Sequence, residues 1–312
     1  MPSPTDNTAE IDTPSGARGG MPVFWRSAPT EGPAAPALYL HGVPTNSDDW
    51  ISPRERHATR SWWRRWWRAK RPSDQWVEPP PYGPGFLERT GGLAPDLPGF
   101  GRSGKPGYLK YTIEEYSAFI ERFLDMVEVE KVRMLVHDWG AVGLAFAQAH
   151  PERIERLVVT NAVTFLPGYD WHRTARAWRT PGLGELVMGA TARPILRFTS
   201  REGNFKPGPM PETWLDTVLD HFDQGTQRAI LRLYRSSPSE VLAKAGERLS
   251  LLTMPSLVVW GMADPYIPPH FAAEYAKALP NSELLELPDA GHWWWFDRPD
   301  AIDRVAEFLL AS

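Results

Sequence analysis

The chain has 312 residues, of which 42% are hydrophobic and 23% are charged. This composition is too apolar for a disordered protein and is enough for a large buried core. Because 34 Lys and Arg face 38 Asp and Glu, with a net charge of −4, no overall basic field would attract nucleic acid or a membrane surface. The chain has no cysteine, which excludes disulfides, Cys-bound zinc, iron–sulfur clusters and thiol nucleophiles.

The first twenty residues are polar, with Pro, Thr, Ser and acidic side chains and no basic start followed by an apolar run. This composition does not match a secretory signal, so we expect residues 1–20 to form a disordered tail. Since no run of about 18 apolar residues occurs along the chain, we predict no transmembrane helix. The protein is therefore expected to be soluble and cytoplasmic.

Beyond this tail, short apolar runs alternate with stretches of helical periodicity. A helix with one buried stripe is predicted over Ile113–Val129, and similar helices over Trp139–Ala149 and Ala301–Leu310. Alternating strands and helices predict an α/β fold with a mainly parallel sheet, whose functional side chains gather beyond the carboxyl ends of the strands. The predicted strands are Val23–Arg26, Ala37–Leu40, Val132–Val136, Leu157–Thr160, Leu257–Trp260 and Glu283–Leu287.

The segment 51–85 differs in composition from the rest of the chain. Between Ile51 and Arg71, eight Arg or Lys accompany one Glu, a local charge of +7. Three interpretations are open: a solvated surface insert, an amphipathic helix that contacts anionic lipid or single-stranded nucleic acid, or translated sequence without a function. In the second interpretation the protein is a binding module for which the rest of the chain serves as a carrier.

A predicted strand runs directly into a helix at Val132–Gly140, with Asp138 at the junction. This pattern is typical of a nucleophile elbow. A carboxylate is already ionised at neutral pH and needs no base to activate it. Its attack on an acyl carbon would give an unstable anhydride, whereas its attack on a saturated carbon gives an ester that water can cleave. The pattern therefore predicts alkyl transfer to Asp138 followed by hydrolysis.

The hydrolysis step needs a base and a group that orients this base. His292 follows the last predicted strand, and Asp264 follows the strand Leu257–Trp260. The chain order of nucleophile, acid and histidine is that of hydrolases with this elbow. The backbone N–H groups of Val43 and Trp139 are candidates for the anion hole. In the alternative interpretation, Asp138 caps a helix and His292 is a packed core residue.

These motifs resemble those of the α/β-hydrolase superfamily, and within it the group with an aspartate nucleophile that contains haloalkane dehalogenases and soluble epoxide hydrolases. The resemblance covers residues 21–50 and 86–312. It implies a core of residues 21–163 and 251–312, interrupted by the basic insert, with a sheet of about eight strands and a helical cap over 164–250. It also implies Asp138 as nucleophile, His292 as base and Asp264 as its partner.

The resemblance leaves two leaving groups open, a halide and an epoxide oxygen. Trp139 stands where dehalogenases place one halide donor, and the sequence segments around Asp138 look more like those of dehalogenases. Because Val43 has no side-chain donor, the second donor would be Trp178 or Trp171 of the cap. We therefore expect a haloalkane dehalogenase-like enzyme.

The alternative is an epoxide hydrolase, since Tyr234 in the run Leu-Tyr-Arg resembles the cap acid of those enzymes. Tyr169 is the other cap tyrosine that could assist it. In either case we expect a small apolar organic substrate and water as partners. No cofactor, metal or nucleotide is predicted, because no histidine pair has metal-ligand spacing and the run Gly99–Gly104 does not open a helix. The oligomeric state is left open.

Overall fold

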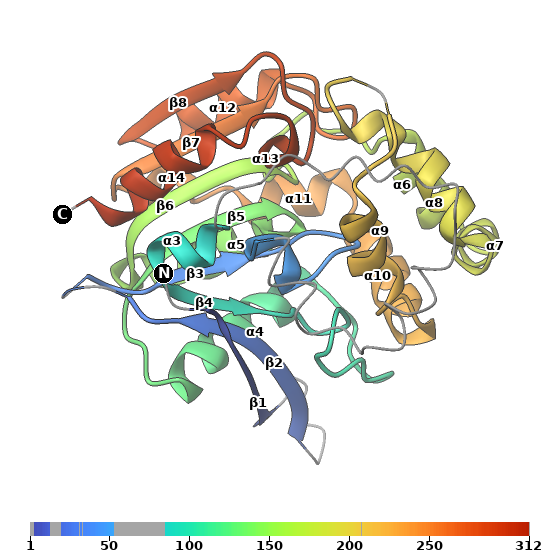
Figure 1. The fold of residues 1–312 in the computed structure, drawn as a ribbon, viewed down its shortest axis with the longest axis horizontal. Coiled ribbons are helices and arrows are strands. Elements are labelled where there is room, and N and C mark those ends of the chain that lie inside the picture. The colour runs from blue at the N-terminus through green and yellow to red at the C-terminus, as the bar shows by residue number, and fades with distance from the viewer. Residues whose placement is uncertain are drawn as a thin grey trace, which may run out of the picture.

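The computed structural model describes residues 3–12, 20–30, 32, 34–52, 85–206 and 208–311. These residues form one eight-stranded sheet in the order β1-β2-β4-β3-β5-β6-β7-β8 (Figure 1). Strands β4, β3, β5, β6, β7 and β8 run parallel, while β2 is antiparallel to both β1 and β4. This arrangement confirms the predicted α/β-hydrolase fold. The strands are β1 (Thr5–Asp12), β2 (Gly20–Ala28), β3 (Ala37–Leu40), β4 (Gly92–Pro95), β5 (Val132–Asp138), β6 (Ile154–Ala162), β7 (Ser256–Gly261) and β8 (Ser282–Leu287).

The N-terminal residues differ from the expected disordered tail. Strand β1 pairs with β2 over its whole length, from Thr5 opposite Ser27 to Asp12 opposite Gly20. It is an edge strand in which only Ile11 is buried. A strand with one buried side chain has little apolar periodicity, so its sequence reads as polar loop although the backbone hydrogen-bonds to a neighbour.

The predicted strands all lie within observed ones, and β3 has the predicted bounds. Strand β4 was not predicted, because Gly-Leu-Ala-Pro contains two residues that usually interrupt strands. Helix α4 (Ile113–Met126) begins after Thr112, whose side chain accepts a hydrogen bond from the N–H of Glu115. It ends three residues earlier than predicted, because Glu128 takes a left-handed φ of 56°.

Both faces of the sheet are buried. In β5, Met134 and Val136 belong to one apolar cluster and Leu135 to the other, as expected for side chains that alternate along a strand. Helices α4, α5 (Val142–Ala149) and α12 (His270–Ala278) cover the first face. Helices α3 (Phe86–Thr90), α13 (Trp294–Asp297) and α14 (Ala301–Leu310) cover the second. This burial on two sides explains the continuous apolar runs by which the central strands were recognised.

Six α-helices connect β6 to β7, in the stretch for which the sequence predicts a helical cap. Figure 1 shows them gathered at one end of the sheet. No helix among the described residues is long and apolar enough to cross a membrane. The six helices are α6 (Arg173–Arg179), α7 (Leu183–Ala190), α8 (Arg193–Thr199), α9 (Glu212–Leu219), α10 (Gln224–Ser236) and α11 (Ser239–Ala245).

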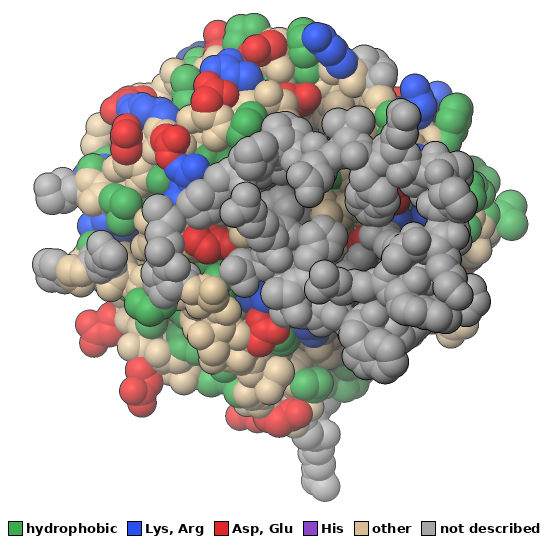
Figure 2. Space-filling view, viewed as in Figure 1, with side chains coloured by type: hydrophobic (Ala, Val, Ile, Leu, Met, Phe, Trp, Pro, Cys, Tyr) green, Lys and Arg blue, Asp and Glu red, His purple; other side chains and the backbone are tan. Residues whose placement is uncertain are grey.

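Acidic and basic side chains are intermixed over the described part of the face drawn in Figure 2. The ion pairs of the described surface include Arg298 with Asp289 at 2.8 Å and Arg153 with Asp125 at 2.9 Å. Exposed pairs of this kind each contribute at most about 1 kcal/mol to stability.

Most of the basic segment 51–85 lies outside the described residues, and so does the amphipathic helix considered for it. Its two ends are described and lie beside each other. The backbone N–H of Ser52 donates to Glu88 Oε1 at 2.7 Å, and the rings of Trp50 and Phe86 are 5.7 Å apart. A Cβ placed on Gly85 would come within 2.7 Å of the Ser52 nitrogen. The chain therefore leaves and re-enters the core at one point.

This geometry predicts that residues 53–84 can be deleted without loss of the fold. With Ser52 and Gly85 joined through two glycines, the packing of Trp50 on Phe86 is retained, and the midpoint of thermal unfolding should change by less than about 5 °C. Differential scanning calorimetry of the full chain and the deletion variant measures the change. Loss of cooperative unfolding in the deletion variant would contradict the prediction.

Candidate active site

Asp138 lies at the junction of β5 and α5 in a strained backbone conformation. Its φ is 49° and its ψ is −122°, and a 3₁₀ turn over Trp139–Ala141 follows it. The turn is tight because a Cβ on Gly140 would come within 2.1 Å of the Leu40 carbonyl oxygen. A Cβ on Gly42 would come within 2.4 Å of the Asp138 Cβ. Only glycine fits at both places, so the local sequence holds the carboxylate at a sharp bend.

The Asp138 carboxylate is buried and is held by two donors. Its Oδ1 accepts the backbone N–H of Val43 at 2.7 Å, and its Oδ2 is 3.5 Å from Nε2 of His292. Burial alone would raise the pKa of Asp138, but the hydrogen bond and charge of His292 together with the Val43 N–H lower it below its ordinary value. The carboxylate is therefore ionised and ready to act as a nucleophile.

His292 connects the two carboxylates. Its Nδ1 is 2.7 Å from Asp264 Oδ2, and Asp264 Oδ1 accepts the backbone N–H groups of Tyr266 at 2.7 Å and Ile267 at 3.1 Å. Burial would lower the pKa of His292, but Asp264 and Asp138 outweigh burial and raise it. In the resting state the imidazole is therefore a cation between two anions. The structure brings together all three residues predicted to form the triad.

Two residues that were not predicted position this triad. Asn161, at the end of β6, donates from Nδ2 to Asp264 Oδ2 at 2.7 Å, and its Oδ1 accepts the Gly261 N–H at 2.9 Å. His137 donates from Nε2 to the His292 carbonyl oxygen at 3.1 Å. Burial lowers the pKa of His137 to about 3, so its ring is neutral. Asn161 could have been recognised as a candidate because it is a polar residue buried at the carboxyl end of a central strand.

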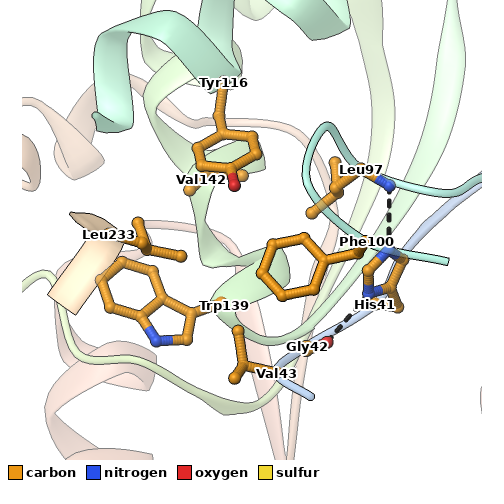
Figure 3. Close-up of a pocket in the computed structure, with 9 residues that line it drawn as sticks. All are labelled: His41, Gly42, Val43, Leu97, Phe100, Tyr116, Trp139, Val142 and Leu233. Atoms are coloured by element: carbon orange, nitrogen blue, oxygen red, sulfur yellow. Dashed lines mark hydrogen bonds between the residues drawn. The ribbon is translucent and has the colours of Figure 1, made fainter. Parts of the chain in front are cut away.

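The Val43 N–H, one of the donors predicted for the anion hole, donates a hydrogen bond to the Asp138 carboxylate. The preceding loop is fixed by His41, whose Nδ1 is 2.9 Å from the Gly42 carbonyl oxygen and whose Nε2 accepts the Leu97 N–H at 2.9 Å (Figure 3). Both ring nitrogens are thus engaged with the backbone, so His41 holds the loop in place.

The predicted leaving-group residues form one aromatic cluster beside Asp138. The ring of Trp139 is stacked on Trp171 at 5.5 Å and meets Tyr234 edge-on at 5.2 Å. Trp178 also meets Tyr234 edge-on, at 5.0 Å, and Tyr169 meets Trp171 at 5.1 Å. Four segments of the chain therefore supply the wall over the nucleophile.

The two cap tryptophans differ in the hydrogen bonding of their indole N–H groups. Nε1 of Trp171 donates to the Ser237 carbonyl oxygen at 3.0 Å, so this N–H is occupied. Nε1 of Trp178 and Nε1 of Trp139 are buried and have no hydrogen-bond partner within the described part of the chain. Of the two cap candidates for a second donor, Trp178 is the one with a free N–H.

The two cap tyrosines are both buried and protonated. Burial raises the pKa of Tyr234, the charge of Asp138 raises it further, and Trp139 partly offsets these effects. Burial and the same charge raise the pKa of Tyr169, whose hydroxyl donates weakly to the Tyr266 carbonyl oxygen at 3.4 Å. Each hydroxyl therefore keeps its proton at neutral pH.

A narrow apolar gap, too tight to admit a water molecule, adjoins the anion-hole loop. Figure 3 shows Phe100 between Trp139 and His41, with Leu233 next to Trp139 and Val142 next to Tyr116. The Tyr116 hydroxyl, which also lines the gap, donates to the Pro98 carbonyl oxygen at 2.9 Å. Among the described residues, no group of three or more His, Asp or Glu is placed to hold a metal ion.

We predict that Asp138→Asn lowers the pKa of His292 by about one to three pH units, because it removes one of two stabilising carboxylates. NMR titration of the imidazole measures this change. The stability that charged His292 contributes is present below its unfolded pKa of 6.5 and is lost as pH rises through the raised folded pKa. In Asp138→Asn this loss should begin at lower pH. Asp289→Asn, which alters a surface pair with Arg298, is the control. An unchanged His292 pKa in Asp138→Asn would contradict the prediction.

The sequence is similar to a haloalkane dehalogenase of Mesorhizobium japonicum, at 28% identity over 70% of this chain and 75% of the relative. It is 30% identical to a haloalkane dehalogenase of Mycolicibacterium paratuberculosis, over 70% and 74% of the two chains. It is also 29% identical to a cis-3-alkyl-4-alkyloxetan-2-one decarboxylase of Shewanella oneidensis, again over 70% and 74%.

Solved structures agree in fold. A haloalkane dehalogenase of Bradyrhizobium elkani superposes with a TM-score of 0.73 at 23% identity, over 98% of each chain. The epoxide hydrolase CorEH superposes with a TM-score of 0.74 at 18% identity, over 99% of each chain. The model of the alpha/beta hydrolase fold family matches residues 36–181 and 197–299, which is well over half of the chain. The chain belongs to the α/β-hydrolase family and is an enzyme of that class.

Proposed function

We propose that this hydrolase cleaves carbon–halogen bonds through a covalent alkyl ester on Asp138. In the first step the carboxylate oxygen not held by Val43 attacks a saturated carbon, and the electron pair of the carbon–halogen bond leaves with the halide. The ionised, buried Asp138 beside His292 carries this proposal. The haloalkane dehalogenases among its relatives support the choice of substrate class, which is a small apolar organic halide.

The second step hydrolyses the ester. Alkylation removes the negative charge of Asp138, so the pKa of His292 falls and the imidazole releases its proton. Neutral His292, oriented by Asp264, then takes a proton from water as the water attacks the ester carbonyl. The resulting oxyanion is stabilised by the Val43 N–H. Collapse of the tetrahedral intermediate breaks the bond to the alkoxide, which takes the proton from His292 and leaves as an alcohol. The carboxylic acid left at Asp138 then passes its proton to His292, which restores the resting ion pair.

The departing halide needs N–H donors. The free indole N–H groups of Trp139 and Trp178 support a halide site in the aromatic cluster, since buried donors without a partner are costly unless a ligand uses them. Trp171 is not available for this role, because its N–H is bonded to Ser237.

A trapping experiment tests this mechanism. Wild type and His292→Gln are incubated with a series of bromoalkanes and with styrene oxide, and the intact protein is weighed. With bromoalkanes, wild type should release bromide and alcohol. His292→Gln should gain the alkyl mass on Asp138, because the water-activating base is missing while the nucleophile remains. Asp138→Ala is the control that gains no mass. If His292→Gln accumulates no adduct from any substrate, the covalent mechanism is wrong.

Opening an epoxide is the second candidate, supported by Tyr169 and Tyr234. Their hydroxyls are buried near Asp138 and keep their protons at neutral pH. In this reaction Asp138 attacks the epoxide carbon, the carbon–oxygen bond breaks, and the alkoxide takes a proton from a tyrosine.

Tyr234→Phe distinguishes the two candidates. A halide needs no proton, so bromide release by Tyr234→Phe should stay within a few-fold of wild type. Turnover of styrene oxide, if wild type shows any, should fall by about 100-fold or more, because the alkoxide loses its acid. Tyr108→Phe, at an exposed position, serves as the control. A large loss of bromide release in Tyr234→Phe would argue against the proposed role of the indole donors.

A further inference from the structure

A cap histidine that the proposed mechanism does not use lies over the active site. His172 directly precedes α6, and its ring is 5.1 Å from the ring of Tyr266. Tyr266 also lies beside His292, at 5.1 Å between ring centroids. The ring of Trp178 meets His172 edge-on at 6.4 Å. His172 therefore lies on the cap side of the triad, next to the indole proposed as a halide donor.

The ring N–H of His172 is available to donate a hydrogen bond. Within the described residues neither of its ring nitrogens makes a hydrogen bond to protein, and the residue is only partly exposed. Its carbonyl oxygen accepts the Arg176 N–H at 3.0 Å, which fixes the backbone at the start of α6. The side chain is thus held near the site by its backbone and its ring contacts, with its N–H unused.

Burial keeps the His172 imidazole neutral at neutral pH. Burial lowers the pKa of His172 to about 4. Asp138 and Asp264 favour its charged form, whereas His292 and Arg176 oppose it. The packed rings of Trp178 and Tyr266 are uncharged at neutral pH. A neutral imidazole has one N–H donor and does not compete with His292 for the nucleophile's negative charge.

We propose that His172 donates an N–H hydrogen bond to the atom that leaves the substrate carbon as Asp138 attacks. This inference rests on the proposed alkylation of Asp138 and adds a third donor, beside Trp139 and Trp178, to its leaving-group site. The bond from carbon to the departing atom breaks as the bond to the Asp138 oxygen forms, and the electron pair stays with the departing halide. His172 keeps its proton and stabilises the new negative charge by its N–H dipole.

The alkylation step can be measured separately in a His292→Gln background, where the ester accumulates. His172→Phe is added to remove the N–H while keeping a planar ring, and His172→Gln is added to keep an N–H donor. Ester formation from a bromoalkane, followed by mass spectrometry, should slow by about tenfold to a hundredfold with His172→Phe. With His172→Gln a large part of the rate should return. His221→Phe changes the other cap histidine and should leave ester formation unchanged.

The second readout is the hydrolysis step. With His292 intact, the decay of ester formed in a single turnover should proceed at the wild-type rate in His172→Phe, because the leaving atom has already departed. Equal rates of ester formation in His172→Phe and its parent would overturn the inference. So would an equal loss in His172→Phe and His172→Gln accompanied by a lower midpoint of thermal unfolding, since this pattern indicates a structural role. Absence of ester in the His292→Gln parent would instead overturn the proposed function.

Discussion

A buried imidazole held between two carboxylates is the interaction on which the rest of this structure depends. Three charged groups in an apolar interior are tolerated only when they are paired and their remaining lone pairs are bonded. His292 therefore needs Asp138 and Asp264 within reach of its two nitrogens, and Asp264 needs Asn161 and the backbone N–H groups after β7. These requirements draw together the ends of β5, β6 and β7 and the segment after β8.

The same interaction links the charge of Asp138 to the protonation of His292. While Asp138 is an anion, His292 is stabilised as a cation and cannot accept a proton from water. Loss of the charge on Asp138 would remove this stabilisation, so in the proposed mechanism the base becomes active only after the ester has formed. The burial of all three side chains makes the coupling strong, because a low local dielectric increases the effect of each charge on its neighbours.

The aromatic wall supplied by the cap gives this charged group an apolar surrounding with a few donors. Trp139 comes from the core, and Trp171, Trp178 and Tyr234 come from three places in the cap. The unpartnered polar groups of this wall include two indole N–H groups and the imidazole of His172. Donors in a water-poor site stabilise a negative charge that develops on a departing atom, and this is the electrostatic pattern that both candidate reactions require.

The fold could be predicted from the sequence alone, and so could the three candidate triad residues that the structure brings together. Carboxyl ends of parallel strands meet at one edge of a sheet, so reactive residues after separate apolar runs could be placed together without knowing a single distance. Strand β1 was not predicted, because an edge strand is held to its neighbour by backbone hydrogen bonds more than by apolar side chains. Only the tertiary structure decided which cap indole is free and where Asn161 and His172 lie. These facts depend on contacts between distant segments, such as Trp171 with Ser237, and no local pattern of residues encodes them.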